Sequence, residues 1–157
     1  MGQDEMLKFY IDTCKQTIAR NVWFPSYFII EAGNEVISVI VPLDISPDFK
    51  TRLTQIGEIL IKVAEEHNKP DLLKAYYIQV TYPGTGEDIG YDNRMISELN
   101  IYMQDFINHR AESHMEYFNW KDKVYLPVDT KGKVAVHPYM KLVKIAFTKM
   151  SRLMSRN

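Results

Sequence analysis

Apolar side chains recur along this chain at two different spacings, which predict its helices and its strands. Near the N-terminus they recur at every third or fourth residue, the spacing of an amphipathic helix. This pattern predicts a helix over residues 4–22, before Pro25. Its apolar stripe consists of Leu7, Tyr10, Ile11, Cys14 and Ile18. Because Cys14 lies on that stripe, we expect its thiol to be a small core group rather than a nucleophile.

The next segment carries the signature of two paired strands. Residues 27–32 and 35–41 are runs of aromatic and β-branched side chains, and only Gly33 and Asn34 separate them. A two-residue loop with glycine first favours a type II′ turn, whose twist matches that of paired strands. The sequence therefore predicts a β-hairpin over residues 27–41.

A second helix and a third strand follow the hairpin. Ser46-Pro47-Asp48 suits a helix N-terminus, because the serine oxygen accepts from free amides, proline is tolerated at the first helical position and the aspartate suits the positive end of the helix. Apolar residues then recur at helical spacing as far as Pro70, which predicts a helix lying on a sheet. Residues 74–82 alternate in the manner of a strand, and residues 124–128 predict another short strand.

Residues 94–120 fit two patterns. Read as a helix, their polar and apolar side chains separate onto opposite faces over the whole span. Read as strands, Leu99, Ile101 and Met103 share one face, and a second strand runs from Met115 to Trp120. We favour the helix because its pattern holds over the longer span, although Arg110 and His114 would then lie on its apolar face.

The last predicted element is a basic amphipathic helix at about residues 138–154, opened by Pro138. One face is apolar, and no acidic residue follows Asp129. The opposite face gathers five basic side chains: Lys141, Lys144, Lys149, Arg152 and Arg156. The element order predicts a single α+β domain over residues 1–157, with a mainly antiparallel sheet built on the hairpin and amphipathic helices packed against it.

Composition narrows the class of protein. The chain has 157 residues, of which 46% are hydrophobic, 25% charged and 12% aromatic, so it can bury a core and is not a disordered protein. A single cysteine excludes a disulfide framework and a cysteine-rich metal site. The sequence shows no export signal, which would consist of a basic start followed by an apolar stretch, and no apolar stretch long enough to span a membrane. We therefore expect a cytoplasmic protein.

The charge is unevenly distributed although the total is only −1. Residues 1–120 carry 10 basic and 18 acidic side chains, a net −8, whereas residues 121–157 carry 9 basic and 2 acidic, a net +7. Such asymmetry is typical of proteins with an anionic partner, so the basic helix is a candidate nucleic-acid surface. The alternative is that the acidic body and the basic region face each other, within one chain or across a dimer.

One loop is a candidate for cation binding. Residues 84–93 combine glycine turns with three carboxylates, Glu87, Asp88 and Asp92, and hard oxygen ligands of this kind suit magnesium or calcium. The loop departs from nucleotide-binding fingerprints, because Ile89 stands where the third glycine is required. A solvated surface loop is the simpler interpretation of the same residues.

No other constellation predicts catalysis or a cofactor. His109 and His114 are five residues apart, which suits shared metal ligation on neither a helix nor a strand, and no nucleophile motif is present. We therefore expect a non-catalytic binding protein that needs no cofactor and whose partner is another protein or a second copy. The two alternatives are a nucleic-acid-associated protein using the basic helix and a divalent-metal enzyme using the acidic loop.

Overall fold

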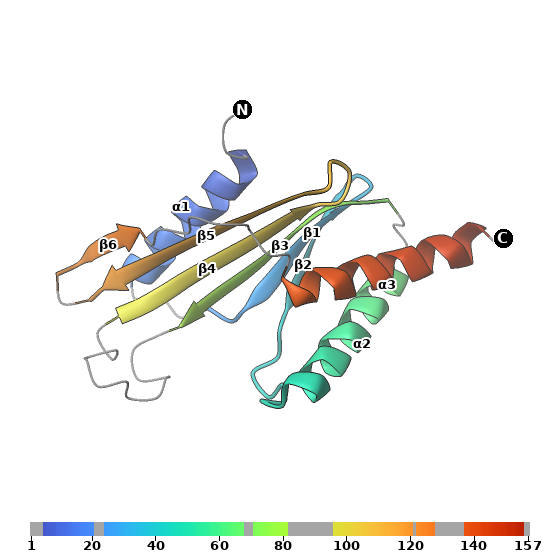
Figure 1. Ribbon diagram of the computed structural model, residues 1–157, viewed down its shortest axis with the longest axis horizontal. Helices are drawn as coiled ribbons and strands as arrows, with labels where there is room; N and C mark the ends of the chain where they lie inside the picture. The colour runs from blue at the N-terminus through green and yellow to red at the C-terminus, as the bar shows by residue number, and fades with distance from the viewer. Residues whose placement is uncertain are drawn as a thin grey trace.

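The computed structural model describes residues 5–20, 24–67, 71–81, 96–120, 122–127 and 137–155. These residues form three helices and six strands. In chain order the elements are α1 (Glu5–Ala19), β1 (Tyr27–Ala32), β2 (Glu35–Ile40), α2 (Phe49–His67), β3 (Leu72–Thr81), β4 (Ile96–Asp105), β5 (Arg110–Asn119), β6 (Val124–Pro127) and α3 (Pro138–Ser155). The α+β class predicted from the sequence is confirmed (Figure 1).

All six strands belong to one antiparallel sheet with the order β2-β1-β3-β4-β5-β6. The predicted hairpin lies at one edge, where β1 pairs with β2 and Ala32 lies opposite Glu35. Of the two loop residues only Gly33 has a positive φ, 60°, which is the requirement of a type II′ turn. Strand β3 then pairs on the other side of β1.

The helices cover the two faces of the sheet unequally (Figure 1). Helix α1 packs on one face against β1, β3, β4 and β5, where Ile18, Tyr76 and Ile101 are fully buried. Helices α2 and α3 pack on the opposite face against β1, β2 and β3, where Ile30, Leu60 and Phe147 are fully buried. The sheet therefore separates two cores, and the helices on its two faces are offset along the strand order.

The start of α2 differs in detail from the sequence prediction. Asp48 is the residue whose carboxylate caps the helix, accepting from the Thr51 amide at 3.0 Å and from the Thr51 hydroxyl at 2.8 Å. Ser46 acts one step earlier, because its hydroxyl accepts from the Asp48 amide at 3.2 Å. These hydrogen bonds lower the pKa of Asp48, so the carboxylate is charged at the positive end of the helix dipole.

The helix predicted over residues 94–120 is wrong. Within this span, residues 96–119 form the antiparallel strands β4 and β5, joined by a tight turn in which His109 has a positive φ of 53°. The alternating residues Leu99, Ile101 and Met103 are buried against α1. Because these side chains find an apolar helix to pack against, burial on one face of a sheet outweighs the longer helical pattern.

None of the described helices combines the length and the apolar character that crossing a bilayer requires.

Candidate functional site

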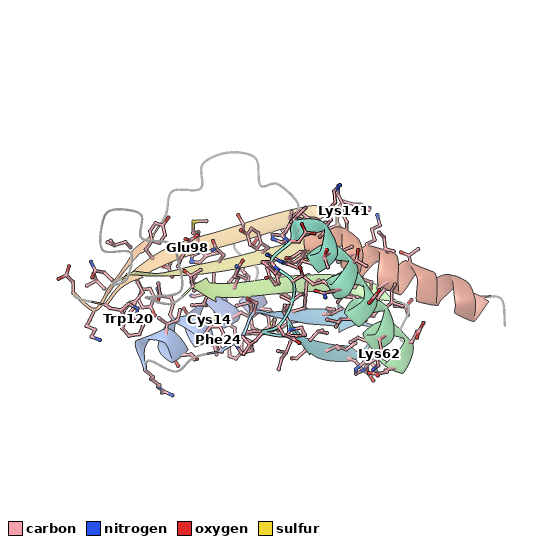
Figure 2. All side chains as sticks on the ribbon, turned by 90° about the horizontal axis from the view of Figure 1, so that it is seen from below. Cys14, Phe24, Lys62, Glu98, Trp120 and Lys141 are labelled. Carbon is pink, nitrogen blue, oxygen red and sulfur yellow. The ribbon has the colours of Figure 1, made fainter. Side chains whose placement is uncertain are left out.

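The basic helix occurs where the sequence places it, and two of its five predicted side chains can be described. Lys141 and Lys144 are exposed on α3 (Lys141 is labelled in Figure 2). Neither forms an ion pair with another described residue. Lys149 and Arg152 belong to the last part of the same helix, and Arg156 lies outside the described residues.

The predicted acidic loop, with Glu87, Asp88 and Asp92, lies outside the described residues. Within the described ranges, no three histidine, cysteine, aspartate or glutamate side chains are grouped so that they could hold a metal ion.

Cys14 occupies the core position that its spacing predicts. The side chain is 2% exposed, and its sulfur lies 3.8 Å from the hydroxyl of Tyr27. Burial raises the pKa of the Cys14 thiol to about 11, although the contact with Tyr27 acts in the opposite direction. The group is therefore a protonated thiol at neutral pH, which is a poor nucleophile.

The four histidines lie apart and have separate environments. His67 ends α2, and its Nδ1 lies 3.1 Å from Glu35 Oε2 at the start of β2. His137 packs among the rings of Tyr77, Tyr102 and Tyr139, and burial lowers its pKa. His109 lies in the β4–β5 turn and His114 on β5, so the two do not converge.

A row of ionisable side chains joins β5 to α1, which the sequence analysis did not predict. Glu116 is 8% exposed and lies 3.2 Å from Lys15 Nζ of α1. Its other oxygen lies 3.4 Å from His114 Nε2. Tyr125 of β6 also donates a hydrogen bond to the Lys15 carbonyl, so Lys15 ties α1 to two strands at the edge of its core.

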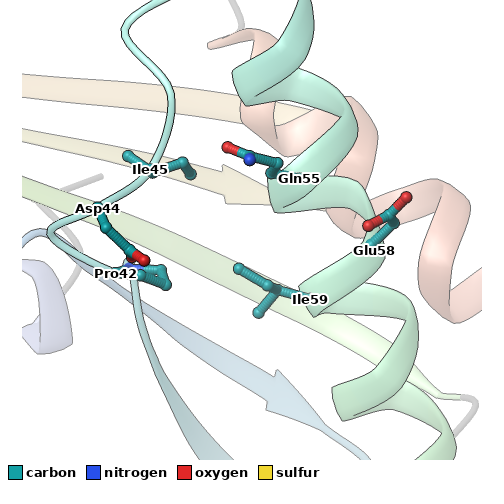
Figure 3. Close-up of a pocket in the computed structure, with 6 residues that line it drawn as sticks. All are labelled: Pro42, Asp44, Ile45, Gln55, Glu58 and Ile59. Carbon is teal, nitrogen blue, oxygen red and sulfur yellow. The ribbon is translucent and has the colours of Figure 1, made fainter.

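A small surface pocket of about 230 Å³ lies between α2 and the segment that connects β2 to it (Figure 3). Its lining comprises Pro42, Asp44, Ile45, Gln55, Glu58 and Ile59. Gln55 is already engaged, because its carbonyl oxygen accepts from the Ser46 amide at 2.9 Å. The remaining polar side chains of the lining, Asp44 and Glu58, are both acidic, so the lining contains no basic side chain beside them.

The most distinctive surface is the outer edge of β2, which has no neighbouring strand among the described residues. Val36 is 65% exposed and Ile40 is 63% exposed, with the exposed Ser38 between them. All three project on the α1 side of the sheet, because Ile37 and Val39 project into the core on the α2–α3 side. Helix α1 leaves them exposed, although its core extends as far as Ile29 and Tyr27 of the neighbouring β1.

The backbone of β2 also presents hydrogen-bonding groups at this edge. Hydrogen-bonded pairs alternate along an antiparallel ladder, and the Val41 amide donates to the Ser26 carbonyl at 2.9 Å. By this alternation Ile37 and Val39 are bonded to β1. The amides and carbonyls of Val36, Ser38 and Ile40 therefore point away from β1, toward the open edge.

The opposite side of the sheet is protected in ways that β2 is not. Strand β6 has only four residues and ends at Pro127. The part of β5 that β6 does not pair with carries Arg110, Glu112 and His114. Short strands, proline and charged side chains all discourage the addition of another strand. Strand β2 contains no lysine, arginine or proline.

No protein family, curated protein or solved structure was found to match this chain.

The alternating sequence predicts β2 as a strand but does not show that its outer edge is an exposed surface. The sequence does contain a signal for an apolar strand edge, because four of the five residues from 36 to 40 are β-branched and apolar and the fifth is Ser38. The missing information was the strand order, which shows that β3 pairs with β1 and leaves β2 on the outside.

Proposed function

We propose that this protein is a non-catalytic binding protein that takes up an extended polypeptide strand along the outer edge of β2. The observation that carries the proposal is the combination of exposed Val36 and Ile40 with outward-pointing backbone groups on the same residues. Strand addition draws its affinity from main-chain hydrogen bonds and its specificity from alternate side chains, and this edge supplies both.

The location of the edge supports the same function. Ile37 and Val39 are held in the core beneath α2 and α3, so β2 is a fixed template. At its first residue, Glu35 is paired with His67, which links the strand to the end of α2. A template that is already ordered loses little conformational entropy when it binds, which favours association.

A synthetic peptide with the sequence of residues 34–42 and a fluorophore at its N-terminus is a direct probe of this edge. We expect a saturable rise in anisotropy with the wild-type protein. In NMR spectra, hydrogen exchange at the amides of Val36, Ser38 and Ile40 should slow on binding, because these amides gain acceptors. The amides of Ile37 and Val39 should change little, because they already donate to β1.

Two variants test whether the edge is the binding site. Ser38→Pro removes an outward amide without removing a bond to β1, and Val36→Lys replaces an exposed apolar side chain. Each should weaken peptide binding about tenfold or more, which corresponds to about 1.4 kcal/mol. The matched control is Ile107→Lys, since Ile107 is 60% exposed but lies in the β4–β5 turn. Equal affinity of both β2 variants and the wild type would contradict the proposal.

A second candidate function is nucleic-acid association through the basic face of α3. It is favoured by the exposure of Lys141 and Lys144 and by the absence of acidic partners for them among the described residues. Two exposed lysines one helical turn apart are able to contact neighbouring phosphates and release their counterions.

The double variant Lys141→Glu/Lys144→Glu tests this candidate. Its retention of a short DNA or RNA duplex should fall, and the slope of log affinity against log salt should become shallower by about 0.9 for each lost phosphate contact. The matched control reverses two exposed lysines of α2 instead, Lys50→Glu/Lys62→Glu. Nucleic-acid retention that both double variants change equally would contradict a specific role for α3.

A further inference from the structure

We infer that the strand added to β2 is β2 of a second copy, so that two chains form a homodimer about a two-fold axis at Ser38. This inference rests on the proposed function, because it requires the outer edge of β2 to accept a strand.

The sequence of β2 is self-complementary when two copies run antiparallel. Centred on Ser38, the pairing places Val36 opposite Ile40 of the second copy, Ile37 opposite Val39, and Ser38 opposite itself. Every position from 36 to 40 except the central serine is therefore a β-branched residue facing another β-branched residue. Such cross-strand pairs are among the favourable ones in antiparallel sheets.

The direction of the backbone hydrogen-bonding groups of β2 agrees with this register. Val36, Ser38 and Ile40 have amides and carbonyls that point outward, as deduced from the ladder between β1 and β2. The register sets these three residues opposite one another, so each facing pair can exchange two hydrogen bonds. A shift by one residue would instead face outward groups with groups already bonded to β1.

Charge does not oppose the pairing. The only charged residue of β2 is Glu35, which lies outside the five paired positions. Its carboxylate is held by His67 on the α2 side of the sheet, away from the face that carries Val36 and Ile40. The exposed side chains of the two copies would therefore form two apolar Val36–Ile40 pairs, one on each side of the facing Ser38 residues, with no like charges facing each other.

The geometry also explains why the assembly would close at two chains. In the part of the chain that the structure describes, each copy contributes six strands, and the dimer would join them into a continuous sheet of twelve with β6 at both ends. Because β6 is short and ends at Pro127, the outer edges resist further addition. Five paired residues make a small interface, so we expect a dimer that forms reversibly as concentration rises.

Charge pairing at positions 36 and 40 tests the register directly. In Val36→Lys/Ile40→Lys, lysines of the two copies face each other, and sedimentation over a concentration series should show only monomer. In Val36→Lys/Ile40→Glu, each lysine faces a glutamate of the other copy, and dimerisation should return. Both positions are exposed in the monomer, so both variants should fold, which circular dichroism can verify.

The controls separate this inference from the proposed function. Ile107→Lys, at an equally exposed site away from β2, should dimerise as the wild type does. A wild type that stays monomeric at every concentration but binds the peptide would overturn the homodimer and leave strand binding intact. Loss of dimer in both double variants would overturn this register, and unchanged dimer in both would show that copies associate elsewhere.

Discussion

The carboxylate of Asp105 stabilises the turn between β4 and β5. Its Oδ1 accepts hydrogen bonds from the amides of Ile107 and Asn108, each at 3.0 Å, and its Oδ2 accepts from the Asn108 side chain at 2.9 Å. Burial alone would raise the pKa of this carboxyl, but the hydrogen bonds outweigh burial and the net shift lowers it. The residue is 2% exposed, so its loss would leave three donors without their acceptor.

We predict that Asp105→Ala lowers the free energy of unfolding at neutral pH by about 2 kcal/mol, because it removes several hydrogen bonds to one buried carboxylate. Folding lowers the pKa of Asp105, so the carboxylate stabilises the protein above its usual pKa of 3.8. That contribution disappears as the pH falls through the lower pKa of the folded state. Urea unfolding of the two proteins should therefore give a difference that shrinks in acid.

Asp44→Ala is the matched control, since Asp44 is exposed in the segment between β2 and α2. Its free energy of unfolding should stay within about 0.5 kcal/mol of the wild type at every pH. A difference for Asp105→Ala that grows in acid would contradict the lowered pKa.

At the scale of elements, spacing was informative wherever one pattern stood alone. The amphipathic helices and the glycine-centred hairpin all occur where the sequence predicts them. The prediction for residues 94–120 was wrong because this segment contains both a polar stripe of helical spacing and an alternating strand pattern. The spacing of polar residues along the chain does not show which residues from distant elements will lie beside them.

The surroundings of Arg110 and His114 differ between the predicted helix and the observed strand. On a helix, Arg110 and His114 would have been buried on an apolar face. On β5 they lie beside carboxylates instead, with Arg110 Nε 3.6 Å from Glu112 and His114 Nε2 3.4 Å from Glu116. These carboxylates lie two residues away, so they alternate onto the same face of the strand, but neither contact is a hydrogen bond.

At the scale of the whole molecule, α3 is a core element with a basic outer face. Tyr139, Val143 and Phe147 lie in the core shared with α2 and the sheet. Lys141, Lys144 and Ile145 are exposed on the other side. The helix therefore contributes its apolar face to folding and leaves only its outer face for a partner.

We predict that Phe147→Ala lowers the free energy of unfolding by about 3–5 kcal/mol, because this fully buried ring would leave a cavity between α3 and the sheet. Lys144→Ala, one turn earlier on the exposed face, should change it by less than about 0.5 kcal/mol. Chemical denaturation monitored by circular dichroism measures both. Equal, small effects would contradict the docking of α3 and leave its apolar face available to a membrane or another partner.

Some features of the candidate site were predictable from the sequence and others were not. The sequence located the lysines of α3 and the strand at residues 35–41, because helical and strand periodicity are properties of neighbouring residues. It did not indicate that Val36 and Ile40 are left exposed, since that depends on where α1 packs and on the pairing of β3 with β1. Those are contacts between residues far apart along the chain.

The amino-acid sequence by itself determined the class of the fold, the hairpin turn at Gly33 and the helices, because each depends on spacing or backbone preference within a few residues. Only the tertiary structure decided the order of the strands, the conformation of residues 94–120 and the exposure of the β2 edge. The physical reason is that burial and strand pairing are satisfied by distant partners. The free energy of those contacts selects among locally acceptable alternatives.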